Sequence, residues 1–147
     1  MLENIHNLLI EDETQLQQIA ENLALQLKPG DRILFFGDMG VGKTTFIAKL
    51  CMFLGADSIS SPTFTLINRY NALNNVIYHM DLYRMNNEKD LISLDLDRYF
   101  EDPKAIVLVE WSEKLQTWEP KPHIRIDLAF PEPFQATQRI YSQQLIH

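Results

Sequence analysis

Eight consecutive residues constrain this chain more than any other part of its sequence. Gly37-Asp38-Met39-Gly40-Val41-Gly42-Lys43-Thr44 fits the pattern G-x-x-x-x-G-K-[ST] completely. A short apolar run, residues 33–36, precedes it, and a predicted helix over residues 43–54 follows and stops at Gly55. This order of strand, glycine loop and helix predicts a P-loop, whose backbone N–H groups and helix N-terminus face bound phosphates. The alternative is a chance glycine turn before a helix, and the strand and helix predicted on either side of the loop weigh against it.

The loop predicts a role for each of its last side chains. We expect Lys43 to reach the β- and γ-phosphates, Thr44 to ligate Mg²⁺ through its hydroxyl, and Thr45 to touch the α-phosphate. Backbone groups should bind the rest of the phosphate chain. The residues predicted to bind the nucleotide through this loop are Asp38, Met39, Gly40, Val41, Gly42, Lys43, Thr44 and Thr45.

Two acidic residues end predicted strands and are candidates to act beside Thr44, because Mg²⁺ prefers hard oxygen ligands. Glu110 ends the apolar run of residues 105–109, and Asp81 ends the run of residues 76–80. Glu110 could instead simply terminate its strand, and Asp81 could cap a helix or pair with Arg84. We interpret His79 as a histidine packed within a strand, since no third metal ligand stands at a suitable spacing.

A further candidate lies in Ser61-Pro62-Thr63-Phe64, between the P-loop helix and the next predicted strand. A threonine there can approach the γ-phosphate and Mg²⁺ and order the loop only when a triphosphate is bound. A turn stiffened by Pro62 is the plain alternative. The residues alone leave both interpretations open for Thr63.

The apolar pattern predicts one α/β domain over residues 1–147. A first helix should begin at residues 12–14 and end before Pro29 and Gly30, and a later helix should span residues 88–100. Residues 123–130 and 138–146 alternate like half-exposed antiparallel strands. The further predicted strands are residues 64–70, 76–81 and 105–110. Strands mixed with helices around a buried core strand predict a three-layer α/β sandwich.

Charge and cysteine content restrict the partners and the compartment. The chain has 20 acidic and 13 basic residues, a formal net charge of −7, so it is poorly suited to grip nucleic acid alone. Cys51 is the single cysteine, which excludes an internal disulfide. No signal-like segment and no apolar run of about 20 residues occurs, so we expect a cytoplasmic protein without a membrane span.

The sequence favours ATP over GTP. The nearest match to the guanine-binding element N-K-x-D is Asn87-Glu88-Lys89-Asp90, which has the wrong order and precedes a helix. A small-metabolite kinase is an alternative, although such enzymes use a lid with several arginines, and the six arginines here are scattered. A nucleotide-dependent binding module without turnover is a third possibility.

Four ordered motifs resemble the TsaE family, also called YjeE. They are G-D-M-G-V-G-K-T-T-F at residues 37–46, S-P-T-F-T-L at 61–66, Y-H-M-D-L-Y-R at 78–84 and V-E-W at 109–111. The resemblance implies a bacterial P-loop ATPase with a mainly parallel sheet and antiparallel strands at its carboxyl end. It also implies a role in making threonylcarbamoyladenosine in tRNA, together with the TsaB and TsaD proteins, while TsaC supplies the activated intermediate. Contact with tRNA would then be indirect, through these partners.

The same resemblance assigns roles to individual residues. Lys43 is implied to clamp the phosphates, Thr44 and Glu110 to ligate Mg²⁺, and Asp81 to be required for hydrolysis. Residues 61–63 would form a switch-like loop that carries Thr63. Glu13 and Thr14 would lie near the nucleotide base, and Trp111 beside the metal carboxylate. The chain departs from the family at Gln135-Ala136-Thr137-Gln138-Arg139, where a Gly-Arg pair is usual and only Arg139 has a counterpart.

Overall fold

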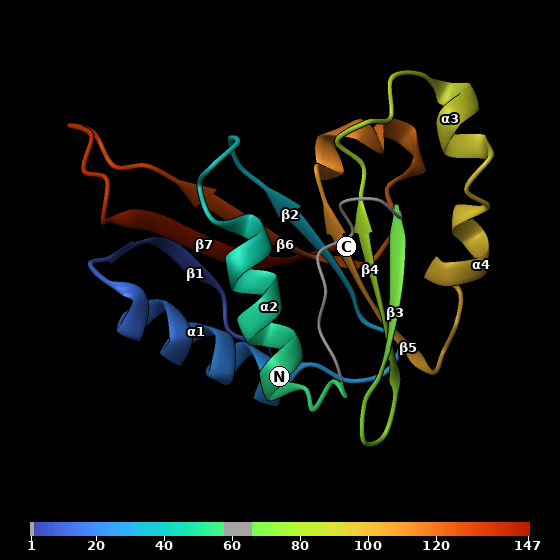
Figure 1. Cartoon of the computed structure of the whole chain (residues 1–147), viewed down its shortest axis with the longest axis horizontal. Helices are drawn as coiled ribbons and strands as arrows, with labels where there is room; N and C mark the ends of the chain where they lie inside the picture. The colour runs from blue at the N-terminus through green and yellow to red at the C-terminus, as the bar shows by residue number, and fades with distance from the viewer. Residues whose placement is uncertain (1, 58–65) are drawn as a thin grey trace.

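The computed structural model describes residues 2–57 and 66–147. Within these residues one mixed sheet runs through the molecule in the strand order β1-β7-β6-β2-β5-β4-β3 (Figure 1). Its strands are β1 (Ile5–Ile10), β2 (Arg32–Phe36), β3 (Ile67–Asn71), β4 (Val76–Asp81), β5 (Ala105–Glu110), β6 (His123–Ala129) and β7 (Arg139–Ile146). The predicted strand at residues 64–70 therefore corresponds to β3, and its first two residues lie outside the described part.

The four central strands of this sheet, β6, β2, β5 and β4, are mutually parallel. β7 and β1 add antiparallel strands beyond β6, and β3 adds one beyond β4. Antiparallel pairing at the carboxyl end is thus confirmed, but it also occurs at the other edge. β6 has one neighbour of each kind, because it lies parallel to β2 and antiparallel to β7. Parallel central strands bring their carboxyl ends to one edge, which is where β2 leads into the glycine loop.

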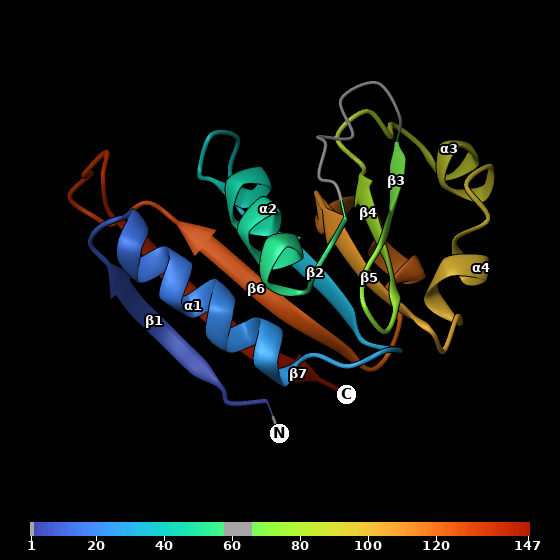
Figure 2. The same cartoon turned by 60° about the horizontal axis from the view of Figure 1, so that its bottom comes forward.

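Two long helices cover one face of the sheet. Figure 2 shows α1 (Glu13–Gln26) and α2 (Lys43–Phe53) side by side across it. α1 begins where the sequence predicts, because the Asp12 side chain accepts a hydrogen bond of 2.9 Å from the backbone N–H of Gln15 and caps the helix. Both helices bury apolar side chains in a core with the sheet, among them Leu16, Ala20, Leu23, Phe46, Ile47 and Leu50.

Short helices pack against the other face, and here the prediction of one helix over residues 88–100 is wrong. The structure has α3 (Glu88–Ile92) and α4 (Leu96–Phe100), separated at Asp95, whose φ of 54° is left-handed. Leu91 and Leu96 are both buried in the second core. Five residues apart, they would point about 140° away from each other on one straight helix. The break lets both side chains face the sheet.

β1 is an edge strand that the sequence analysis did not predict. Its residues show no strict alternation, Asn7 has a φ of 51°, and its register with β7 shifts between Ile5 and Leu8. Only Ile10 of this strand is fully buried. Its pairing comes from β7, far away in the sequence. Among the described residues, no helix is both long and apolar enough to cross a bilayer.

Candidate functional site

The glycine loop connects the carboxyl end of β2 to the first turn of α2, as the sequence predicts. The turn is closed by a hydrogen bond of 3.2 Å from the Val41 N–H to the Asp38 carbonyl. Gly37 has a φ of +149°, and a Cβ placed on it would overlap the carbonyl oxygen of Leu128 in β6. Gly42, with a φ of +107°, starts the helix. The loop thus packs closely against β6 at Gly37 and leads into the first turn of α2 at Gly42.

Lys43 turns back over its own loop. Its Nζ donates to the carbonyl oxygen of Gly37 and lies 3.7 Å from the centroid of the Trp111 ring. The side chain is buried, which lowers the pKa of its ammonium group, while the nearby carboxylates of Glu113, Glu110 and Asp81 oppose that shift. The ammonium group is therefore held at the loop's inner side and surrounded by negative charge.

A carboxylate and a hydroxyl meet beside Lys43. The Thr44 Oγ1 donates to Glu110 Oε1 at 2.6 Å, joining the first turn of α2 to the end of β5. Glu110 is only 2 % exposed. Its other oxygen, Oε2, lies 2.7 Å from His79 Nε2. Glu110 therefore ends its strand inside the site, next to Thr44, and not at the surface.

Asp81 lies next to Glu110, because the two residues are partners in the parallel register of β4 and β5. Its Oδ1 accepts a hydrogen bond of 3.0 Å from the Tyr83 N–H. Burial raises the pKa of this carboxyl group, and the negative charge of Glu110 adds to the effect. No ion pair with Arg84 occurs among the described residues. Asp81 thus faces the same space as Lys43 and Glu110.

Two adjoining cavities follow the loop. The first, of about 360 Å³, is lined by loop residues together with Asp81, Glu110 and Trp111. The second, of about 410 Å³, lies toward α1 and β7 and includes Glu13. Gly40, Gly42 and Thr45 line both cavities, so the two form one elongated site.

The structure brings together most residues that the sequence nominated. Those that line the elongated site are Glu13, Asp38, Met39, Gly40, Val41, Gly42, Lys43, Thr44, Thr45, Asp81 and Glu110. Thr14 is exposed on α1 and does not line either cavity. Thr63, with the rest of residues 61–63, lies outside the described residues.

Arg139 has a role that sequence reasoning missed. Its Nε donates to the Val41 carbonyl at 2.7 Å, and one terminal nitrogen donates to the carbonyl oxygens of Ala136 and Gln138. Its guanidinium also lies 4.2 Å from the centroid of the Phe130 ring. Arg139 therefore ties the turn before β7 to the glycine loop. Strand β7 and the loop are almost 100 residues apart in sequence, so only the fold could reveal this contact.

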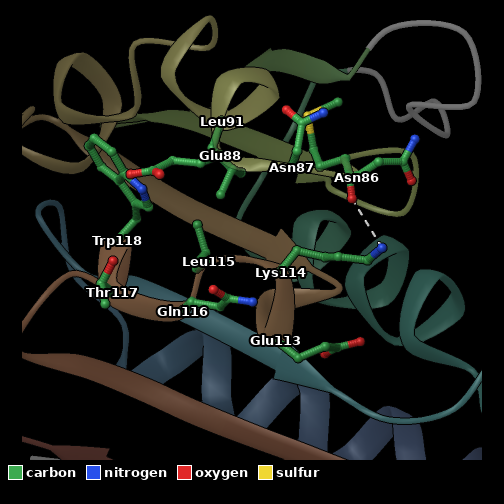
Figure 3. Close-up of a pocket in the computed structure, with 11 residues that line it drawn as sticks. Asn86, Asn87, Glu88, Leu91, Glu113, Lys114, Leu115, Gln116, Thr117 and Trp118 are labelled. Atoms are coloured by element: carbon green, nitrogen blue, oxygen red, sulfur yellow. Dashed lines mark hydrogen bonds between the residues drawn. The ribbon is translucent and has the colours of Figure 1, made fainter.

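A separate cavity of about 400 Å³ opens between the start of α3 and the two 3₁₀ helices, η1 (Ser112–Lys114) and η2 (Gln116–Trp118) (Figure 3). Lys114 reaches across it and donates to the Met85 carbonyl at 3.0 Å. None of the residues predicted to bind nucleotide or metal lines this cavity.

Fold and site together define the class: a mixed α/β protein whose glycine loop lies at the carboxyl edge of its parallel strands, beside a buried carboxylate. The family model described as threonylcarbamoyl adenosine biosynthesis protein TsaE matches residues 10–139. The chain belongs to the TsaE family, which acts in tRNA threonylcarbamoyladenosine biosynthesis. This confirms the resemblance found in the four motifs.

Individual relatives agree with this assignment. The tRNA threonylcarbamoyladenosine biosynthesis protein TsaE of Rickettsia conorii is 36% identical over 126 residues, which cover 84% of this chain and 70% of that protein. The Bacillus subtilis protein of the same name is 41% identical over 109 residues, 74% of this chain and 67% of that protein. The crystal structure of Bacillus YdiB superimposes with a TM-score of 0.77 at 28% identity and covers 100% of this chain and 88% of that one.

Proposed function

We propose that this protein binds ATP with Mg²⁺, hydrolyses it, and thereby assists the TsaB and TsaD proteins in modifying tRNA. The observation that carries the proposal is the contact of 2.6 Å between the Thr44 hydroxyl and the Glu110 carboxylate at the first turn of α2. We further propose that the fold is the three-layer sandwich of P-loop NTPases, with the mixed sheet as its middle layer.

The residues present suit Mg²⁺. Thr44 and Glu110 offer a hydroxyl and a carboxylate, the hard oxygen ligands that this ion prefers. The described residues contain no cluster of three or more His, Cys, Asp or Glu side chains that could hold a metal by themselves. Mg²⁺ in nucleotide sites takes its other ligands from phosphates and water, so two protein oxygens are sufficient. When bound, the ion would neutralise charge on the phosphates during hydrolysis.

The other side chains divide the remaining tasks. Lys43 would leave the Gly37 carbonyl and neutralise the terminal phosphates, while the N–H groups of the loop hold the phosphate chain. Asp81 would orient the attacking water. We assign Thr63 to the terminal phosphate as well, in keeping with its motif. The base would occupy the second cavity beside Glu13, with Thr14 nearby on the same turn of α1.

Charge supports an indirect role toward tRNA. With a net charge of −7, the protein gains little from the phosphate backbone, so TsaB and TsaD would make the tRNA contacts. This division of work would take place in the cytoplasm. ATP binding would order the segment that carries Thr63 and dock the protein on its partners, and hydrolysis would release it.

The first test measures Mg²⁺-dependent ATP hydrolysis by the purified protein, alone and with added TsaB–TsaD. We expect weak activity alone and a clear rise with the partners. Glu110→Gln keeps the shape of the side chain, so its hydrolysis should fall about 100-fold while its melting temperature changes little. Glu101→Gln is the matched control, because Glu101 is exposed and follows α4 at the amino end of β5, away from the glycine loop. ATP hydrolysis that is unchanged by added TsaB–TsaD and by Glu110→Gln would contradict the proposal and would favour the small-metabolite kinase.

A further inference from the structure

His79 is buried behind Glu110, beside the cavity that Glu110 lines, and the sequence predicts it to be a packing residue. It lies on β4 between apolar neighbours, with only 2 % of its surface exposed. Its register partner on β5 is Leu108. An imidazole in such a place loses its contact with water, which costs free energy unless its nitrogens find partners.

One nitrogen has found a partner, and that partner is Glu110. His79 Nε2 lies 2.7 Å from Glu110 Oε2, while Thr44 Oγ1 lies 2.6 Å from Glu110 Oε1. A carboxylate can only accept, so His79 Nε2 carries the proton of this hydrogen bond. The other nitrogen, Nδ1, is buried without a hydrogen-bond partner among the described residues. Within the described part of the chain, the imidazole therefore hydrogen-bonds only to the Glu110 carboxylate.

The two contacts divide the carboxylate into an inner and an outer oxygen. Oε2 faces the interior and is held by His79, and Oε1 faces Thr44 and the loop. Without His79, Oε2 would be buried without a donor, and the carboxylate would gain by turning toward the nearby Lys43 ammonium. The charge of Glu110 already acts on that ammonium group. A carboxylate paired with Lys43 would compete with the phosphates for it and leave Thr44.

We propose that His79 is a positioning residue, which holds Glu110 so that Oε1 stays beside Thr44 and thereby sets the Mg²⁺ affinity of the nucleotide site. This proposal rests on the proposed function. Hydrogen-bond partners behind metal ligands commonly change metal affinity by about 10- to 100-fold when they are removed. His79 would act in this way without touching metal or nucleotide itself.

Two substitutions in the full chain separate this role from packing. His79→Leu has a similar size and no donor, whereas His79→Gln offers an amide N–H at a reach close to that of Nε2. We would measure ATP binding by calorimetry, first across a MgCl₂ titration and then in EDTA. His79→Leu should raise the Mg²⁺ concentration for half-maximal binding about 10-fold or more. Its ATP affinity in EDTA should fall by a clearly smaller factor, because only the competition of Glu110 for Lys43 acts there. His79→Gln should stay within about threefold of wild type in both measurements.

An unshifted Mg²⁺ midpoint in His79→Leu would overturn the proposal, as would an equal loss of affinity with and without Mg²⁺. If His79→Leu does not fold, His79→Gln is compared with His79→Asn, whose shorter amide stops short of Glu110. Equal midpoints in that pair would overturn the proposal as well. If ATP binding by the wild-type protein does not depend on Mg²⁺, the proposed function and this inference are both refuted. If the wild type depends on Mg²⁺ but the variants have the same Mg²⁺ midpoint as the wild type, only the inference is refuted.

Discussion

Replacing Gly37 with alanine should destabilise this protein clearly more than the same change at Gly40, three residues along the same loop. Both glycines have a positive φ, +149° at Gly37 and +80° at Gly40, so alanine is strained at either position. Only Gly37 is also in close contact with the rest of the fold. Its new Cβ would overlap the carbonyl oxygen of Leu128 and lie 2.9 Å from Val41 Cγ1, whereas a Cβ on Gly40 meets nothing within 4 Å.

The structure gives the expected size of this difference. Backbone strain costs about 1–3 kcal/mol at either glycine. Overpacking adds about 1–3 kcal/mol at Gly37, because the obstructing oxygen belongs to the backbone of β6 and cannot rotate away as a side chain would. Gly37→Ala should therefore lose about 2–6 kcal/mol of unfolding free energy and Gly40→Ala about 1–3 kcal/mol. Against a typical total of about 5–15 kcal/mol, the first loss would leave a marginal protein.

Urea denaturation followed by tryptophan fluorescence and far-UV circular dichroism measures both losses. The comparison is valid if the dependence on urea has the same slope in both variants, because equal slopes mean equal exposure on unfolding. Losses that agree within about 0.5 kcal/mol would show that the overlap with Leu128 is relieved at no cost, and would refute the reasoning from close packing.

Three further predictions concern α1 and α2. Asp12→Ala removes the cap of α1 and should lower the unfolding free energy by about 1 kcal/mol, whereas Asp12→Ser should keep most of the stability that the cap provides. Thermal denaturation of both variants checks this, and equal losses would contradict the role of the cap. Burial raises the pKa of the Cys51 thiol from 9.0 to about 12. Iodoacetamide at pH 8 should therefore modify Cys51 only after the protein unfolds, and rapid labelling of the native protein would contradict its burial. The pKa of this thiol is higher in the folded state, so as pH rises the thiol ionises first in the unfolded state. The unfolding free energy should therefore fall as pH rises above about 9, by about 1.4 kcal/mol at pH 10. Cys51→Ala should lack this part of the alkaline decline, which urea denaturation between pH 8 and 10 can measure.

The sequence by itself was enough for the elements whose signals are local. The glycine loop, α2, β4 and β5 appear where the apolar runs and the glycines predict them, because each depends on neighbouring residues in the chain. The start of α1 at Asp12 is likewise a local capping signal. Family membership followed for the same reason, since each of the four motifs is a short contiguous string.

Only the tertiary structure decided which of these elements meet. His79 and Glu110 stand 31 residues apart, and their hydrogen bond exists because β4 and β5 pair in a register that places Asp81 beside Glu110. Arg139 reaches Val41 because β7 returns alongside β6. β1 and the break at Asp95 also depend on distant partners, the first on β7 and the second on the core beneath α3 and α4. Pairing between strands and packing between layers are set by residues far apart in the chain, so local patterns nominate the residues of the site, and the fold determines their contacts.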